Sequence, residues 1–303
     1  MNNSDDASSI DYSLVQGVTL SGIVITSIGL FLNISSYLTG LNLKFQNSTI
    51  TLIRCQAIWD SISIIQDGYV ELGGRYLHYN ILDKNDFLCK MLSYHSWGST
   101  FSSNYHMVLI SMDRVLAIRY PIWYKENSTI SLGHKISICI VIFAYGISFP
   151  NAFKFTTLNS ACILDASPTF IYWYAGIHVP FFGFVLPLAI MVCCNIYFIY
   201  SLRSRQSSNK TERRLTFMLM TNSTVFCLIS STVVLVQYYV TDYLSKATFG
   251  EGQMLLQLGD RLQYVLAIIN SSVNFVFYFI CGPMFRTAYF NVLRSLVCKA
   301  KKS

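Results

Sequence analysis

Long stretches without ionised side chains dominate this sequence. Six of them contain no Asp, Glu, Lys or Arg, and they cover Val18–Leu43, Met91–Met112, Ile136–Phe153, Ala166–Leu202, Leu215–Thr241 and Leu262–Phe285. A helix needs about 20 mainly apolar residues to cross the hydrocarbon core of a bilayer. Only helices and closed barrels satisfy the backbone there, and the alternating ten-residue pattern of barrel strands is absent. The stretches therefore predict membrane-spanning helices.

A seventh stretch, at about Ile50–Leu72, resembles the others in length and apolar content but contains Asp60 and Asp67. We predict a helix here as well, whose acids need a function or a partner. The expected spans are about 17–43, 50–72, 87–119, 134–153, 172–202, 212–241 and 256–282. The predicted fold is an all-α membrane protein with one seven-transmembrane domain at 17–283. Residues 1–16 would precede it, and a short amphipathic eighth helix and tail would follow at 284–303.

The distribution of charge predicts the orientation. Only 12% of the residues are charged, against roughly 25% in soluble domains, which excludes a disordered chain and a nucleic-acid-binding domain. Of the 22 Lys and Arg residues, 16 fall on one side of the expected layout, and that excess marks the cytoplasmic side. We therefore expect a multi-pass plasma-membrane protein with an extracellular N-terminus, a cytoplasmic C-terminus and basic residues near anionic lipid.

Covalent modifications are expected at a few sites. Cys89 begins the third span and Cys162 lies in the loop between the fourth and fifth, both on the oxidising outer side. A disulfide between them would tie that loop to the bundle; the alternative is two free thiols. The triplet that starts at Asn2 predicts glycosylation, and Cys298 follows a basic amphipathic stretch that suits palmitoylation.

The third span ends in SMDRVLAIRYP, residues 111–121. An Arg at a membrane edge needs a carboxylate, and Asp113 and Glu212 are the acids within reach of Arg114. With seven spans and Cys89 placed 25 residues before Arg114, the chain resembles a rhodopsin-like (class A) G-protein-coupled receptor. The resemblance implies a resting-state ionic lock among these three residues and an Arg114 that later faces a heterotrimeric G protein. The alternative is an Arg that only extends its charge to water.

A second polar group lies at mid-span depth around Asp60. Ser103, Asn270, Ser271 and Asn274 lie at matching depths on other helices, as does Asn33, and oxygen-rich ligation suits a hard cation. The resemblance implies an interior sodium ion here; the alternative is a neutral Asp60 in a hydrogen-bond network. We expect no other cofactor.

The expected activation core departs from the family pattern. The resemblance places Pro187, Asn104, Phe226, Ser230, Asn274 and Tyr278 in it. Ser230 stands where the family has Trp, Thr232 where it has Pro, and Phe275 follows Asn274 in place of another Pro. Ser and Thr can bend a helix by bonding to the preceding turn. The chain is thus similar to a divergent branch, such as invertebrate peptide receptors or a flatworm orphan group; a non-signalling decoy is the alternative.

Acidic residues mark the expected ligand pocket. Ser96 stands where monoamine receptors carry an acid, and the seventh span has no Lys for retinal. Asp67 and Glu71 share a helical face with Asp60, and an acidic wall at the outer end favours a cationic ligand. The other expected pocket residues are Trp97, Thr100, Gln237, Tyr238, Asp260, Tyr264 and Ile268. The aromatic ones also suit a membrane-interface belt.

Together these features predict a receptor that binds an extracellular ligand, a neuropeptide above all, and activates a heterotrimeric G protein through the cytoplasmic end of the third span. A receptor for a small amine or other cationic ligand is the first alternative. A membrane transporter is the second, although repeated halves and broken helices are not visible. The sequence contains no metalloprotease motif, phosphate loop or nucleophile elbow, so we expect no enzyme.

Overall fold

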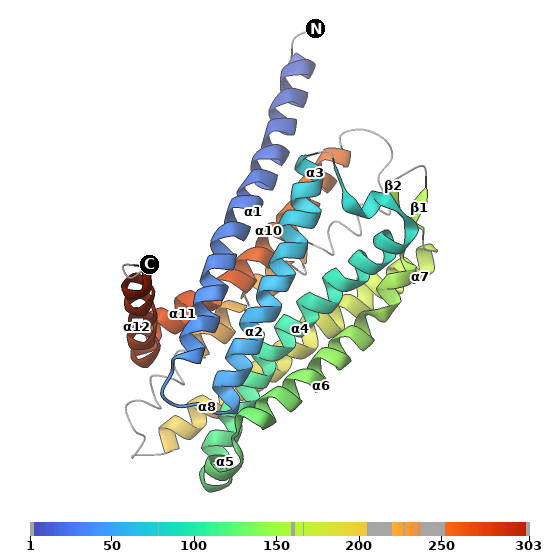
Figure 1. The fold of residues 1–303 in the computed structure, drawn as a ribbon. Coiled ribbons are helices and arrows are strands. Elements are labelled where there is room, and N and C mark those ends of the chain that lie inside the picture. Colours follow the sequence, from blue (N-terminus) through green and yellow to red (C-terminus); the bar gives the residue numbers. More distant parts are fainter. Residues whose placement is uncertain are drawn as a thin grey trace.

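The computed structural model describes residues 3–77, 79–158, 161–165, 167–204, 220–226, 228–233, 235–236 and 252–300. Its helices lie side by side in an elongated bundle (Figure 1). The first part of the chain forms α1 (Asn3–Leu41), α2 (Ser48–Ile64), α4 (Asp86–Arg119), α5 (Pro121–Asn127) and α6 (Ile130–Ser148). The later part forms α7 (Pro168–Trp173), α8 (Leu186–Ser204), α10 (Gly252–Ser272), α11 (Asn274–Cys281) and α12 (Pro283–Ala300). In the expected sixth span, the described residues from 220 to 236 are helical.

Several helices begin at a side-chain cap. Asn47 accepts a hydrogen bond from the backbone N–H of Ile50 before α2, and Asn85 accepts one from Leu88 before α4. Such caps satisfy amides that the first turn leaves without partners. The helix α1 begins at Asn3, well before the expected span at 17, and its first turns extend beyond the bundle (Figure 1).

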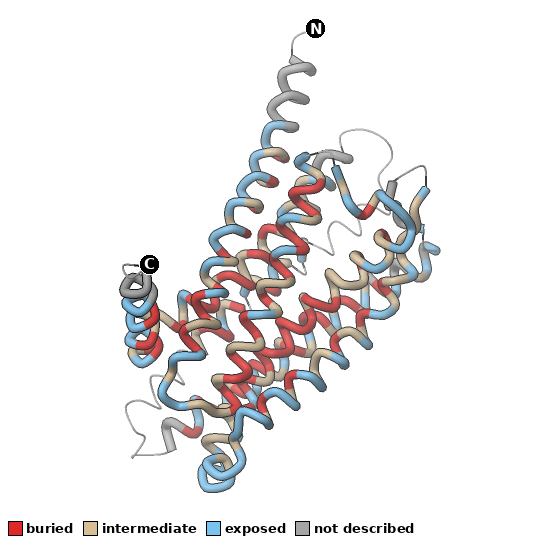
Figure 2. Tube along the Cα trace, in the orientation of Figure 1, coloured by how far each residue is buried: buried red, intermediate tan, exposed pale blue. Residues whose placement is uncertain are grey.

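Four helical stretches among the described residues are long and apolar enough to cross a membrane: Ser13–Leu41, Ile130–Phe153, Gly176–Ser201 and Gln257–Ile280. The helices α2 and α4 are more polar, and many of their residues are buried in the middle of the bundle (Figure 2). Their polar side chains therefore face other helices, where they find hydrogen-bond partners.

The second helix changes its winding at its far end. After Ile64 it continues as the π-helical segment η1 (Ile65–Gly73) and the short α3 (Gly74–Tyr76). A Cβ at Gly68 would collide with Thr26 of α1, so only glycine allows the two helices to approach this closely. The wider winding leaves Asp67 and Glu71 buried while Tyr69 is exposed, and π-helical segments often occur at functional sites.

A hairpin and a disulfide close one end of the bundle, which we call the hairpin end. The antiparallel strands β1 (Phe155–Leu158) and β2 (Ala161–Leu164) follow the 3₁₀ segment η3 (Phe149–Phe153). The predicted disulfide is confirmed, because Cys89 of α4 is bonded to Cys162 of β2.

Two aspartates hold the same hairpin. Asp83, in the 3₁₀ segment η2 (Ile81–Lys84), accepts a hydrogen bond from the Cys162 N–H at 2.7 Å. Asp86 accepts bonds from the Thr156 hydroxyl at 2.9 Å and the Thr157 N–H at 3.1 Å. Hydrogen bonds from Lys90 and Thr156 lower the pKa of the Asp86 carboxyl, which therefore stays ionised at neutral pH.

The helix α12 lies in the region where an amphipathic helix was expected. Among its described side chains, those of Phe285, Ala288 and Val292 are buried, and the Phe285 ring centroid lies 5.7 Å from that of Phe275 in α11. Phe275 stands where the resemblance expects a Pro. Its ring makes an aromatic contact that joins the seventh helix to α12. Asn2 lies outside the described residues, and the Cys298 side chain lies outside the described side chains.

Candidate functional site

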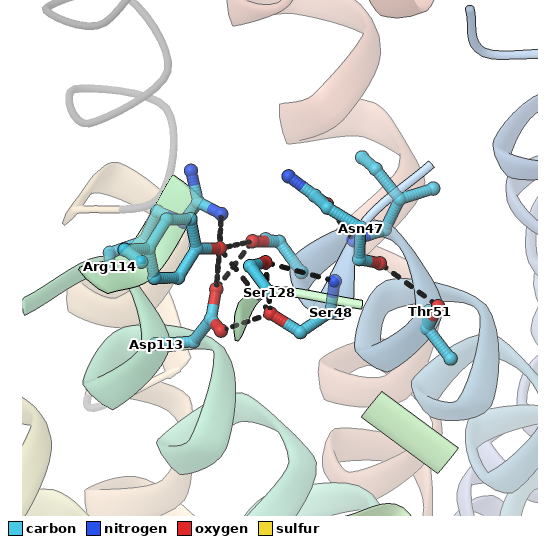
Figure 3. Close-up of polar contacts among 9 residues, drawn as sticks. Asn47, Ser48, Thr51, Asp113, Arg114 and Ser128 are labelled. Carbon is cyan, nitrogen blue, oxygen red and sulfur yellow. Dashed lines mark hydrogen bonds and ion pairs between the residues drawn. The ribbon is translucent and has the colours of Figure 1, made fainter. Parts of the chain in front are cut away.

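A buried polar network surrounds Asp113 at the other end of the bundle, which we call the Asp113 end (Figure 3). One carboxylate oxygen accepts a hydrogen bond from the Ser48 hydroxyl at 2.6 Å. The other accepts bonds from the Thr49 hydroxyl, from the Tyr124 hydroxyl at 2.8 Å and from Arg114 Nη2 at 3.0 Å. The side chains come from α2, α4 and α5, so a single carboxylate connects three elements.

Tyr124 bonds to both charged groups of this network. It lies on α5, which begins at Pro121, two residues after α4 ends at Arg119, and its hydroxyl also accepts a hydrogen bond from Arg114 Nη2 at 2.9 Å. Ser48 also exchanges a hydrogen bond with Ser128 at 2.7 Å. Sequence reasoning identified Asp113 and Arg114 but not these partners, because a Ser or Tyr at the edge of a span carries no distinctive pattern.

One nitrogen of the Arg114 guanidinium has no hydrogen-bond partner among the described residues. Its Nε is buried and makes no hydrogen bond within the described part of the chain. The third member of the expected ionic lock, Glu212, lies outside the described residues. The observed ion pair is therefore the one between neighbours, Arg114 and Asp113.

The expected polar group around Asp60 is assembled. Asp60 is fully buried, and its carboxylate accepts hydrogen bonds from the Ser103 hydroxyl and from Asn274 Nδ2, the latter at 2.8 Å. The Ser271 side chain also bonds to it. None of the ion pairs between described residues involves Asp60. Asn270 makes no described contact with Asp60, and its buried Oδ1 has no hydrogen-bond partner among the residues that the structure places.

Further hydrogen bonds extend this polar group. Asn33 of α1 donates to the Ser271 carbonyl at 3.0 Å, and the Tyr278 hydroxyl donates to Gln56 Oε1 at 3.1 Å. Buried polar side chains thus join α1, α2, α4 and the seventh helix. The seventh helix consists of α10 and α11, which meet at Val273.

A cavity of about 60 Å³ lies toward the hairpin end. It is lined by Asp67, Ser96, Trp97, Thr100, Phe184, Val233, Gln263, Tyr264 and Ala267. Five of the expected pocket residues are therefore present, whereas Gln237 and Tyr238 lie outside the described residues. Ile268 does not line this cavity, and its placement is corrected: it packs with Ile64, Leu72 and Val265. The side of α10 that carries Ile268 faces α1 and α2.

A layer of paired charges lies beside the cavity. Arg75 binds Glu71 at 3.3 Å and also Asp260, which binds Arg261 at 2.7 Å. Glu71, which was expected in an acidic wall of the pocket, does not line this cavity and is paired with Arg75 of α3. Asp260 is likewise paired rather than free in the pocket.

The expected activation core contains an unusual contact. Asn104 Nδ2 donates to the Gly183 carbonyl at 3.2 Å, and the Tyr105 hydroxyl donates to the Phe182 carbonyl at 2.7 Å. Both carbonyls belong to η5 (Phe181–Val185), one of two π-helical segments, with η4 (Tyr174–His178), that precede α8. Asn104 and Tyr105 of α4 thus hold the π-helical segment of the fifth helix by two hydrogen bonds.

Three other residues of the expected activation core are Phe226, Pro187 and Ser230. Phe226 packs with Phe101, Tyr105 and Met191, and Pro187 is buried at the start of α8. Ser230 is buried, and its hydroxyl has no partner within the described ranges. The Thr232 hydroxyl bonds back to the Leu228 carbonyl at 3.0 Å, which is the bond by which a Thr can bend a helix in place of Pro.

Comparison with known proteins shows which family shares this architecture. The model of the family "7 transmembrane receptor (rhodopsin family)" matches residues 76–278. The chain is 24% identical to C-C chemokine receptor type 3 of Cavia porcellus, over 70% of the chain and 60% of that receptor. It is 26% identical to C-C chemokine receptor type 1 of Homo sapiens, over 70% of the chain and 62% of that receptor.

A third relative is the gonadotropin-releasing hormone receptor of Mus musculus, at 33% identity over 39% of each chain. The chain thus spans less than two thirds of the length of these relatives. Because the family model matches more than half of the chain, this protein belongs to the rhodopsin family of seven-transmembrane receptors, as a divergent multi-pass membrane receptor and not an enzyme.

Proposed function

We propose that this protein is a plasma-membrane receptor that binds an extracellular peptide at the hairpin end and activates a heterotrimeric G protein at the Asp113 end. The observation that carries the proposal is the ion pair of Arg114 and Asp113, held by Ser48, Thr49 and Tyr124. The excess of Lys and Arg on the same side of the predicted layout supports a cytoplasmic position for this end. The relatives are named as receptors for chemokines and a releasing hormone, which favours a peptide ligand.

The network suits a switch between two arrangements of the bundle. In the resting arrangement Asp113 and Tyr124 bind the Arg114 guanidinium. A ligand that binds another arrangement more tightly would shift the population toward it. Release of Arg114 from Asp113 would then let its guanidinium face the G protein. The buried polar side chains around Asp60 lie between the two ends of the bundle, where they join α1, α2, α4 and the seventh helix.

The test is a G-protein dissociation assay in cells that display the receptor at their surface, challenged with pooled neuropeptides and, separately, pooled amines. We expect a peptide response that falls at least about tenfold in Arg114→Ala at equal surface expression, because a charged contact contributes about 1.5–3 kcal/mol. A peptide response that Arg114→Ala leaves unchanged would contradict the proposed coupling. Substrate flux without coupling would favour a transporter.

A receptor for a small cationic ligand is the second candidate. The observation that favours it is Asp67, a carboxylate that is 4% exposed and lines the cavity. A response to pooled amines that is lost in Asp67→Asn, together with no response to peptides, would support this candidate over the first.

We also propose that Asp60 holds an interior sodium ion with oxygens of Ser103, Ser271, Asn274 and Asn270. The residues fit a cation, because the Asp60 carboxylate has no described ionic partner and Asn270 Oδ1 is a buried acceptor without one. Carboxylate, hydroxyl and amide oxygens are the ligands that hard cations prefer. The ion would offset the cost of a buried charge in the resting arrangement.

Sodium is therefore expected to weaken agonist binding. Replacing choline chloride by sodium chloride at constant ionic strength should lower agonist affinity several-fold in the native receptor. Asp60→Asn should abolish this difference, because the amide cannot neutralise the ion. Competition binding in membranes measures both values. A sodium effect that persists in Asp60→Asn would place the ion elsewhere.

A further inference from the structure

The cavity at the hairpin end contains a carboxylate that no described cation neutralises. Asp67 Oδ1 accepts a hydrogen bond from the Ser96 hydroxyl at 3.2 Å, and none of the ion pairs between described residues involves Asp67. The neighbouring acids differ, since Arg75 and Arg261 pair with Glu71 and Asp260. A buried carboxylate needs a cationic partner or a proton, so Asp67 is the acid that remains for a ligand.

The seventh helix adds a second acceptor to the same cavity. Gln263 Nε2 donates to Asp260 Oδ1 at 3.4 Å, and this bond directs the amide so that Oε1 is the free end. That oxygen is buried and has no hydrogen-bond partner within the described part of the chain. Asp67 and Gln263 line the cavity from the second and seventh helices. A ligand group that bonds to both must donate hydrogens in more than one direction.

The side chains that line the cavity, and its volume, further restrict which chemical group of a ligand it can bind. Trp97, Phe184 and Val233 supply flat aromatic and apolar surface. The volume of about 60 Å³ is far below the roughly 300–1,000 Å³ of pockets that enclose a drug-sized ligand, so the cavity suits one small head group of a ligand. A guanidinium is planar, donates hydrogens in several directions and stacks on aromatic rings, whereas an ammonium is a compact and strongly hydrated charge.

We propose that this cavity binds one guanidinium group of the ligand, with Asp67 as its counter-ion and Gln263 Oε1 as its second acceptor. The inference rests on the proposed receptor function and names the chemistry of its ligand: an arginine side chain or another guanidine. Arg75 pairs with Glu71, and Arg75 and Arg261 pair with Asp260, so Asp67 is the acid of this group that has no ion pair among the described residues. The cavity therefore accepts a single cationic group and not two adjacent ones.

The experiment uses the purified full-length receptor in lipid nanodiscs and two small probes, n-butylguanidine and n-butylurea. The probes have the same number of heavy atoms and a similar shape, but only the guanidine is charged. We expect n-butylguanidine to bind at least about tenfold more tightly than n-butylurea, since hydrogen bonds to charged groups are roughly twice as strong as neutral ones. Ligand-detected NMR or isothermal calorimetry measures both affinities.

Two variants locate the binding. Asp67→Asn should remove the preference for the guanidine and leave the weak binding of the urea, and Gln263→Leu should weaken guanidine binding about threefold to tenfold. Asp86→Asn is the matched control, because this acid lies at the same end of the bundle but faces the hairpin. Its affinity for n-butylguanidine should equal that of the native receptor.

Equal affinities of the native receptor for the two probes would overturn the inference and would show that Asp67 carries a proton. Failure of both probes to bind a receptor that still unfolds cooperatively would overturn it as well, as would guanidine binding that survives Asp67→Asn. None of these results bears on coupling: a peptide response that depends on Arg114 would still support the proposed function.

Discussion

Asp113→Asn is expected to raise basal G-protein activation toward the agonist-stimulated level. The substitution keeps the shape of the side chain but removes the charge that holds Arg114, and both side chains are nearly buried, at 10% and 11% exposure. Removing one partner of a buried ion pair costs about 3–5 kcal/mol. A loss of about 3 kcal/mol from the resting arrangement changes the ratio of two conformations on the order of 100-fold. Nucleotide exchange in membranes without ligand measures the effect.

Tyr124→Phe is a milder change to the same network, and its basal signal is to be compared with that of Asp113→Asn. It removes one hydroxyl from the network but leaves the ion pair of Arg114 and Asp113 in place. That hydroxyl bonds to the charged groups of Asp113 and Arg114, and a hydrogen bond to a charged group contributes about 1.5–3 kcal/mol. At the lower figure the basal signal should rise about tenfold, less than in Asp113→Asn. A basal signal that falls in Asp113→Asn at equal surface expression would show that the carboxylate supports the active arrangement instead.

Loss of the disulfide is expected to have the second large effect. Cys89 and Cys162 are separated by 73 residues, and opening a loop of that length removes about 4 kcal/mol of stability by chain entropy. We expect the double variant Cys89→Ser and Cys162→Ser to reach the cell surface at less than about a tenth of the native level. Flow cytometry with an N-terminal tag, and thermal unfolding of the purified protein, measure the loss.

The control for the disulfide is Cys139→Ser, because Cys139 is an exposed free cysteine in α6. It should match the native receptor in surface level and midpoint of unfolding. Asp83 and Asp86 still bind the hairpin through hydrogen bonds in the double variant. Native surface expression of the double variant would mean that these bonds hold the loop without the disulfide.

Sequence reasoning succeeded where a property belongs to a short piece of chain. The fourth span was expected at 134–153, and α6 with η3 covers Ile130–Phe153, because burial of apolar side chains in lipid depends only on local composition. The disulfide was predictable for a similar reason. Cys89 begins the third span and Cys162 lies in the loop after the fourth, so the order of the spans puts both on the outer side.

Side chains that depend on helix rotation were harder to place. Regular helical spacing put Ile268 in the pocket, but packing of α10 against the first two helices turns it into the core. Phe184 and Gln263 line the cavity and were missed, because no local pattern distinguishes them from other residues of their helices.

The sequence by itself therefore determined the membrane class, the number of spans, the disulfide and the identity of Asp113, Arg114 and Asp60 as unusual charges. Only the tertiary structure decided which charges remain unpaired. Arg75 reaches Asp260 of the neighbouring α10 because η1 and α3 carry it toward that helix, and this pairing leaves Asp67 as the acid of the cavity. Ion pairing between distant segments depends on a few ångströms of separation, and no local sequence pattern specifies that distance.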